Sequence, residues 1–125
     1  AGPNVHILTL STLAADLAVL EKDFETVGEI AEADTLMMHA VMMTSTPSLL
    51  YWTAETMTIL QVVRRWRAEG LPCYFTIDAG PNVHILTLST LAADLADRLR
   101  LMREVENVMV CAPGQGVKRV EEHQF

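Results

Sequence analysis

The sequence is poor in basic side chains. Nine lysine and arginine residues stand against sixteen aspartate and glutamate residues, which gives the 125-residue chain a formal net charge of −7. Proteins that bind a nucleic-acid backbone use clustered cations to displace its counterions. The one basic cluster, "RRWRAEG" at residues 64–70, is better explained as the end of a helix, where cations complement the helix dipole. The charge therefore argues against a nucleic-acid partner.

Membrane spans, signal peptides, disulfides and metal sites also lack support. The chain has no uncharged apolar run of about 18 residues, which a membrane span requires, and its N-terminus lacks the basic and then apolar pattern of a signal peptide. Cys73 and Cys111 stand far apart without CxxC spacing, and the four histidines show no HxxxH spacing. We therefore expect a cytoplasmic protein with two buried, reduced thiols, no metal site and no membrane partner.

Eighteen residues occur twice. Half of the chain is apolar and a fifth is charged, which is typical of one globular domain. Residues 1–18 are identical to residues 79–96, but only the second copy is preceded by an aspartate, Asp78. Since an old repeat would have drifted, we interpret the first copy as a recent duplication, a chimera or an engineered addition. The chain is thus divided into a duplicated strand–helix segment, 1–18, and a domain, 19–125, which together form one compact unit.

Apolar residues spaced three or four apart predict three helices. They are expected over residues 13–43, 53–68 and 91–105. The methionine-rich end of the first helix, "LMMHAVMM" at residues 36–43, is interpreted as core filling rather than as a binding surface. Hydroxyl side chains are available to cap two of these helices: Ser11 or Thr12 for the first, and Ser89 or Thr90 for the third.

Alternating and β-branched stretches predict the strands. They lie at residues 5–10, 73–77, 83–88 and 108–112, the last of them a buried strand, with a turn at 113–116 and a short polar edge strand at 117–122. The order strand, helix, helix, strand, strand, helix, strand indicates an α+β domain. We expect a ferredoxin-like antiparallel sheet with helices on one face and one additional helix, in which the first copy supplies a strand.

The loop "DAGPN" at residues 78–82 joins the two strands of a predicted hairpin. Gly80 tolerates a positive φ, Pro81 fixes the next φ, and Asn82 can bond to the local backbone. On these grounds alone, Asp78 is a carboxylate that caps a turn.

Three segments, in this order, resemble a known family. "DFETVGEIAEADTLMMHA" (23–40), "GLPCYFTIDAGPNVHIL" (70–86) and "VCAPGQGVKRV" (110–120) resemble the C-terminal half of mevalonate diphosphate decarboxylases. These enzymes belong to the superfamily of galacto-, homoserine, mevalonate and phosphomevalonate kinases. The resemblance extends over about residues 19–121 and implies the C-terminal domain fold of that superfamily.

The resemblance implies an ATP-dependent decarboxylase of isoprenoid biosynthesis. Such enzymes phosphorylate the tertiary 3-hydroxyl of a phosphorylated mevalonate and then eliminate phosphate and carbon dioxide to give an isopentenyl phosphate. The catalytic aspartate of the family corresponds to Asp78, which would orient or deprotonate that hydroxyl, and Gly80, Pro81 and Asn82 would bind substrate. "PSLLYWT" and "RRWRAEG" resemble members that act on the monophosphate, so both the monophosphate and the diphosphate stay open.

The family's N-terminal lobe, which binds ATP and magnesium and holds the substrate carboxylate with an arginine, has no counterpart in this sequence. "APGQG" at residues 112–116 is a lone glycine-rich turn without a following GK[ST]. We therefore expect no cofactor in this chain and no activity from the chain alone.

Two other functions remain open. The chain could be an engineered or duplicated structural domain that only folds and self-associates, as a homo-oligomer formed by strand exchange or by an exposed lobe interface. It could also be a small-ligand module with a cleft between the hairpin loop and the "APGQG" turn.

Overall fold

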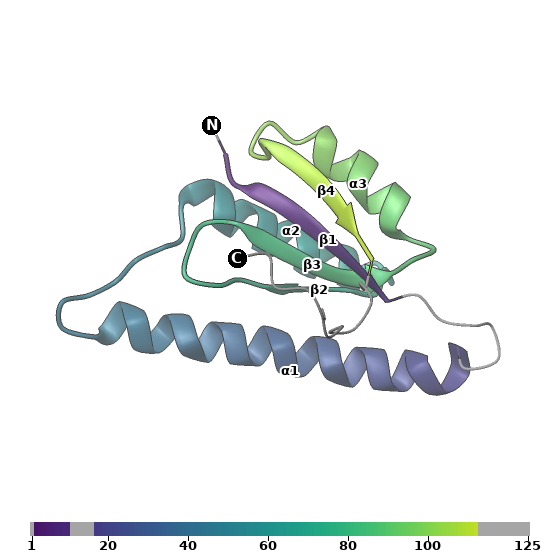
Figure 1. Ribbon diagram of the computed structural model, residues 1–125, viewed down its shortest axis with the longest axis horizontal. Coiled ribbons are helices and arrows are strands. Elements are labelled where there is room, and N and C mark those ends of the chain that lie inside the picture. Colours follow the sequence, from purple (N-terminus) through teal and green to yellow (C-terminus); the bar gives the residue numbers. More distant parts are fainter. Residues whose placement is uncertain (1, 11–16, 113–125) are drawn as a thin grey trace, which may run out of the picture.

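In the part that the structure describes, the chain folds into a four-stranded sheet with three helices (Figure 1). The computed structural model describes residues 2–10 and 17–112, and for residue 10 and residues 17–23 it describes the backbone alone. Its elements are β1 (Asn4–Leu10), α1 (Leu17–Thr44), α2 (Ala54–Ala68), β2 (Cys73–Thr76), β3 (Val83–Leu88), α3 (Ala92–Arg100) and β4 (Asn107–Cys111). The predicted α+β class and element order are confirmed. The predicted cap at Ser11 or Thr12, the turn at 113–116 and the strand at 117–122 lie outside the described residues.

The strand order is β2-β3-β1-β4. β2 and β3 form the predicted antiparallel hairpin, but β1 pairs in parallel with both β3 and β4. The expected wholly antiparallel sheet is therefore wrong. A single crossing helix would bring the chain back to the end of the sheet where β1 starts. Here α1 runs back along the sheet and α2 runs forward again (Figure 1). As a result β2 starts where β1 ends and runs opposite to it, whereas β3 and β4 run parallel to β1.

The duplicated segment forms two neighbouring strands, β1 and β3. Their register places each residue opposite its own copy, from Val5 beside Val83 to Leu10 beside Leu88. Because side chains alternate between the faces of a sheet, this register puts the same residues of both copies on the same face. Val5, Ile7, Val83 and Ile85 are all fully buried.

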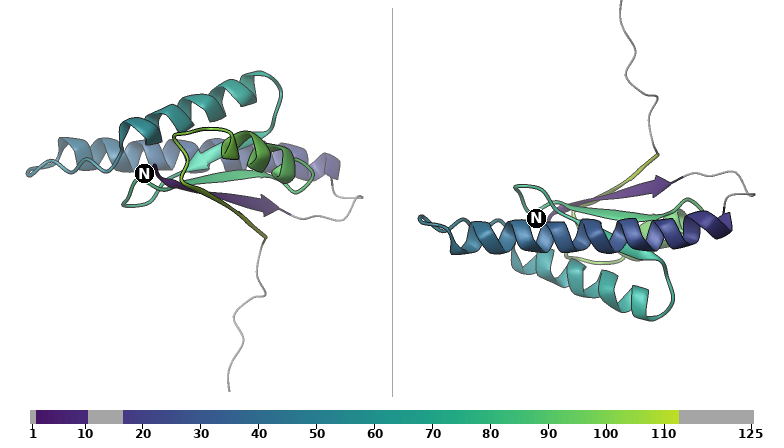
Figure 2. Two further views of the ribbon diagram at one scale, coloured as in Figure 1. Left: turned by 90° about the horizontal axis from the view of Figure 1, so that it is seen from above. Right: turned by 90° about the horizontal axis from the view of Figure 1, so that it is seen from below.

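One hydrophobic core lies between the sheet and two helices. α2 and α3 cover the same face (Figure 2), and their buried side chains pack with those of the strands; the members from the two helices are Ile59, Leu60, Val62, Val63, Trp66, Ala92, Leu95, Ala96 and Leu99. β4 is an edge strand, in which only Val108 is buried, so the expectation of a buried strand there is wrong. Among the described strands β4 pairs on one side only, with β1.

Helix α1 lies along the edge of the sheet, beside β2, and not over a face (Figures 1 and 2). The residues that it buries form one stripe: Phe24, Gly28, Glu32, Thr35 and His39. Apolar side chains point outward instead, since Ile30, Met37 and Val41 are 63%, 62% and 69% exposed. The predicted core role of the methionine-rich stretch is therefore wrong, because this helix faces the polar backbone of a strand edge.

The helix ends follow local chemistry. Thr53 caps α2, where its hydroxyl accepts a hydrogen bond from the Thr56 amide at 3.2 Å, and Gly70 takes a positive φ of 95° after its last turn. The predicted caps of α3 are wrong, because Leu91 occupies the cap position without a side-chain hydrogen bond. α3 also ends at Arg100, earlier than predicted.

Close packing of α1 on β2 requires a glycine. A Cβ atom at Gly28 would overlap the ring of Tyr74, so we expect Gly28→Ala to lower the free energy of unfolding by about 1–3 kcal/mol. In a Tyr74→Ala background the ring is gone, and the same substitution is expected to stabilise by about 1 kcal/mol through helix propensity. Urea denaturation of the four proteins measures both changes. Equal effects in the two backgrounds would show that the overlap is not the cause.

Candidate functional site

The hairpin loop presents Asp78 to solvent. Ile77, which follows β2, is 1% exposed, whereas Asp78 is exposed. The backbone oxygen of Asp78 accepts a hydrogen bond from the Gly80 amide at 2.9 Å. Among the described residues, no hydrogen bond or ion pair involves the Asp78 carboxylate. The expected turn-capping role is thus filled by the backbone, and the carboxylate is left available.

Three elements hold this loop in place. The Thr56 hydroxyl of α2, fully buried, donates to the Pro81 carbonyl at 2.9 Å. The Asn4 amide of β1 donates to Oδ1 of Asn82 at 3.1 Å, and Nε2 of His39 on α1 donates to the Ile77 carbonyl at 3.3 Å. The backbone on both sides of Asp78 is therefore fixed before any ligand arrives, which helps to position a reacting group.

Gly80 does not behave as predicted. Among the described residues only Gly70 has a positive φ, so the expected use of Gly80 for that conformation is wrong. No atom lies within 4 Å of the place where a Cβ of Gly80 would stand. The glycine therefore leaves open space beside Asp78.

Polar side chains of α1 satisfy the outer edge of β2. Oε2 of Glu32 accepts from the Phe75 amide at 3.5 Å, and the Thr35 hydroxyl accepts from the Ile77 amide at 3.3 Å. His39 completes the series at the Ile77 carbonyl. These three residues were not predicted from the sequence. Their signal was the spacing of polar side chains, three and four apart, inside an apolar helix.

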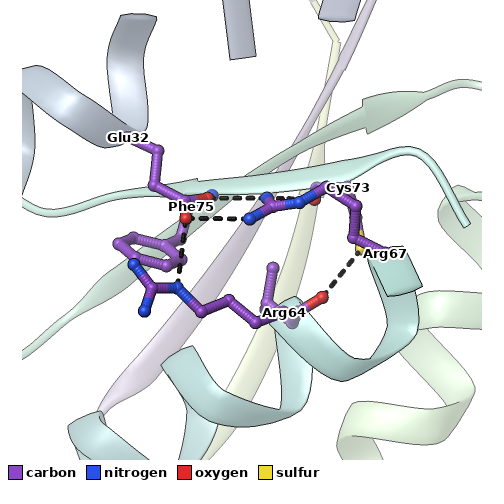
Figure 3. A network of polar contacts seen from close by, with 6 residues as sticks. Glu32, Arg64, Arg67, Cys73 and Phe75 are labelled. Carbon is purple, nitrogen blue, oxygen red and sulfur yellow. Dashed lines mark hydrogen bonds and ion pairs between the residues drawn. The ribbon is translucent and has the colours of Figure 1, made fainter. Parts of the chain in front are cut away.

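Glu32 is the centre of an ionic network that joins α1, α2 and β2 (Figure 3). Arg67 bonds both of its carboxylate oxygens, at 2.7 and 2.9 Å, and Arg64 bonds Oε1 at 3.3 Å. Burial alone would raise the pKa of Glu32, but the hydrogen bond and charge of Arg67, the Phe75 amide and Arg64 together lower it. Glu32 is 6% exposed and is thus a buried carboxylate kept ionised by paired cations.

Aromatic rings pack around His39, beside the loop. The ring centroid of Trp52 lies 4.6 Å from that of His39, and the centroid of Tyr51 lies 6.3 Å away. These contacts fix the orientation of the imidazole that holds the Ile77 carbonyl. Nε1 of Trp52 is buried and has no hydrogen-bond partner within the part of the chain that the structure describes.

The two thiols lie on opposite edges of the sheet. Cys73 on β2 is fully buried, and burial raises the pKa of its thiol to about 11, so it is an unreactive core residue. Cys111 on β4 is only half-buried, which corrects the expectation of two buried thiols. With β3 and β1 between them, the two thiols cannot pair.

The expected cleft between the hairpin loop and the "APGQG" turn is not formed by the described residues. The loop precedes β3, beside the start of β1, whereas Ala112 follows the end of β4, and these three strands are parallel. The loop and Ala112 therefore lie at opposite ends of the sheet. Residues 113–116 of the turn are outside the described range.

Other candidate sites in the described ranges are sparse. Residues 2–10 and 17–112 contain no group of three or more His, Cys, Asp or Glu side chains arranged to hold a metal ion. No helix in these ranges has the length and apolar character to cross a membrane. A recess lined by Phe24, Arg67, Tyr74 and Leu88 lies near the start of β2, and Asp78 does not line it.

The comparisons with known proteins agree on one family. The family model described as mevalonate 5-diphosphate decarboxylase C-terminal domain matches residues 1–123. The phosphomevalonate decarboxylase of Haloferax volcanii is 37% identical over 71 residues, which are 56% of this chain and 22% of that protein. The diphosphomevalonate decarboxylase of Debaryomyces hansenii is 34% identical over 70 residues, which are 54% of this chain and 18% of that protein.

Solved structures lead to the same family. The mevalonate pyrophosphate decarboxylase from Streptococcus pyogenes has a TM-score of 0.59 and 45% identity, and the match covers 62% of this chain and 25% of that one. A complex of MDDEF with MVAPP, AMPPCP and magnesium has a TM-score of 0.60 and 41% identity, over 66% of this chain and 25% of that one. This chain thus spans about a quarter of the length of these enzymes.

The Glu32 network makes stability depend on pH. The pKa of Glu32 is lowered below its ordinary value of 4.5, so its contribution is present above that value and is lost as the pH falls through the lowered pKa. We expect Glu32→Gln to cost about 2–4 kcal/mol of unfolding free energy at neutral pH, because two arginines lose their partner. The difference from the unmodified protein is expected to shrink in acid.

Glu29→Gln provides the matched control for that experiment. Glu29 lies one turn earlier on α1 and is exposed, so its substitution is expected to change stability by less than about 0.5 kcal/mol. Urea titrations from neutral to acidic pH measure all three proteins. An equal loss at every pH for Glu32→Gln would contradict the proposed ionisation.

Proposed function

The chain belongs to the family of mevalonate 5-diphosphate decarboxylase C-terminal domains, and we propose that it carries the part of such an enzyme that presents Asp78 to a phosphorylated mevalonate. The observation that carries this proposal is an exposed carboxylate on a loop fixed by α1, α2 and β1. In this loop, residues 78–82, Asp78 is the catalytic residue. Gly80, Pro81 and Asn82 line the approach of the substrate.

The chemistry assigned to Asp78 is proton transfer or orientation at the 3-hydroxyl of the substrate. An ionised carboxylate within hydrogen-bond distance accepts that proton and leaves an oxygen better able to attack a phosphorus atom. The open space beside Gly80 allows the substrate to approach to that distance. Pro81 and Asn82 act mainly by position, because the Pro81 carbonyl and Oδ1 of Asn82 are already bonded within the protein.

The described residues do not fit a complete site for ATP and magnesium. No three carboxylate, thiol or imidazole side chains come together across residues 2–10 and 17–112 to hold a cation. Phosphoryl transfer depends on positioning and on charge stabilisation around the phosphates, which Asp78 alone does not provide. We therefore propose that the remaining three quarters of the enzyme supply the nucleotide site, and that this chain is inactive by itself.

A second role, self-association without catalysis, is favoured by the outer face of α1. Val27, Ile30, Met37 and Val41 are all more than half exposed on this helix, and adjacent apolar side chains of this kind mark surfaces that pack against protein. This role concerns a different surface from the loop of Asp78. Both roles are compatible with one chain.

The catalytic role is tested by a chimera in which residues 1–125, with the central strand β1 included, replace the corresponding C-terminal part of the Streptococcus pyogenes enzyme. ADP and carbon dioxide release is measured with ATP and either mevalonate 5-phosphate or mevalonate 5-diphosphate. We expect Asp78→Asn to lower kcat by about 10²–10⁴-fold, the usual contribution of a general base. The substrate that is turned over faster identifies the preferred phosphorylation state.

Asp97→Asn is the control, since Asp97 is an exposed carboxylate on α3, and its kcat is expected to stay within about twofold of the unsubstituted chimera. The original chain is assayed in parallel and is expected to show no turnover. Turnover by the chain alone that Asp78→Asn abolishes would refute the need for a second lobe. Equal activity of the Asp78→Asn and unsubstituted chimeras would refute the role of Asp78.

A further inference from the structure

Two histidines lie side by side on the face of the sheet that points away from α2 and α3 (Figure 2). Val5 and Ile7 of β1, like their copies in β3, are buried in the core, so His6 and His84, which alternate with them, point to the other face. The register of the two strands places these histidines directly opposite each other. Their ring centroids are 4.9 Å apart, at an interplanar angle of 70°. The duplication thus brings two imidazoles together, one from each copy.

Both imidazoles are available to bind a ligand. His6 and His84 are half-buried, and within the described residues neither ring forms a hydrogen bond. His39 differs, since its ring is buried and bonds the Ile77 carbonyl. Neutral imidazole is the commonest metal ligand among protein side chains, and the net charge of −7 on the chain favours cations. Two adjacent imidazoles without protein partners are therefore candidates for a shared metal ion.

The separation of the two rings fits one ion bound by both. An imidazole nitrogen binds a transition-metal ion at about 2 Å, which places the ring centre about 3 Å from the ion. Two rings on opposite sides of the ion would have centres about 6 Å apart, whereas a bent arrangement gives about 5 Å. The observed 4.9 Å corresponds to the bent arrangement. Such an arrangement leaves room at the ion for a third ligand.

Met109 of β4 is placed to be that third ligand. It lies opposite His6 in the register of β1 and β4. Its neighbour Val108 is buried, so the side chain of Met109 points to the same face as the two histidines. Met109 is 44% exposed, and its flexible thioether can turn toward a strand about 4.8 Å away. The strands β3, β1 and β4 thus each provide one donor side chain, in one row across the sheet.

The donor atoms of this row select the kind of ion. Imidazole suits zinc, copper, nickel and iron, whereas a thioether is a soft ligand that favours Cu(I). The oxygen ligands that calcium and magnesium require are not provided by these three side chains. The HxxxH spacing does not reveal such a set, because its histidines come from two different strands and its third member is a methionine.

From this geometry we propose that His6, His84 and Met109 form a binding site for one Cu(I) ion on the open face of the sheet. The ion joins three strands that the unfolded chain does not hold together, so its binding stabilises the folded state. The site uses none of the residues of the Asp78 loop. It therefore does not depend on the function proposed for that loop.

The experiment uses the full chain with Cys111→Ser, because the half-buried thiol of Cys111 is itself a ligand for Cu(I). The protein is titrated in the absence of oxygen against bicinchoninate, a chelator whose Cu(I) complex is coloured. We expect one ion per chain. His6→Gln and His84→Gln are each expected to weaken binding by at least about 10-fold, since each removes one ligand. No binding to the Cys111→Ser chain, or undiminished binding to either glutamine variant, would overturn the proposal.

Met109→Leu tests the third ligand, because it removes the sulfur and keeps an apolar side chain of similar size. It is expected to weaken Cu(I) binding by about 10-fold. Met57→Leu is the matched control, since Met57 is 40% exposed but lies on α2, which covers the other face of the sheet. Its Cu(I) affinity is expected to stay within about twofold of the unsubstituted value. Equal losses for the two leucine variants would show that Met109 is not a ligand.

NMR gives a second answer that needs no histidine variant to fold. Cu(I) is diamagnetic, so the imidazole ¹⁵N signals of the Cys111→Ser chain stay visible when it binds. Among the four histidines, His6 and His84 are expected to shift. Shifts of His39 or His123 in their place would overturn the proposal. Cu(I) is also expected to raise the urea midpoint of this chain, and a midpoint that does not rise would contradict binding to the folded state.

Discussion

The outer edge of β2 is the constraint on which the rest of this fold depends. An edge strand presents unpaired amide and carbonyl groups, and these are costly when buried without partners. Here the partners are side chains of a helix, because Glu32, Thr35 and His39 meet the Phe75 amide, the Ile77 amide and the Ile77 carbonyl in turn. This requirement decides which face of α1 points inward.

The orientation of α1 affects the contacts at both ends of β2. A buried Glu32 needs cations, and Arg67 and Arg64 bring α2 against the same edge. At the other end, His39 holds the last buried residue before Asp78. The ionic network and the exposed carboxylate are thus two ends of one row of polar contacts. The position of Asp78 depends on the helix that covers the edge as much as on the loop that contains it.

Features that depend on local sequence patterns were predicted correctly, whereas features that depend on tertiary neighbours were not. The hairpin, the element order and the loop of Asp78 follow from strand period and turn residues, which are local. The inward face of α1 was predicted from apolar spacing, a rule that assumes an apolar partner. Met37 points outward because the partner is a polar strand edge. The strand directions were also not predicted. With two helices between them, β1 and β2 run in opposite directions, and β3 and β4 run parallel to β1.

The duplicated segment shows the effect of local sequence and the effect of tertiary neighbours separately within one molecule. "VHILTL" is a strand in both copies, because its alternation suits either central position of the sheet. "AGPN" differs: at Gly80 it is a loop with space around it, while at Gly2 it is packed against the Glu104 carbonyl. Identical residues thus acquire different roles from their surroundings. Asp78 directly precedes the copy whose first residues form a loop, so the function proposed for it rests on context as well as on sequence.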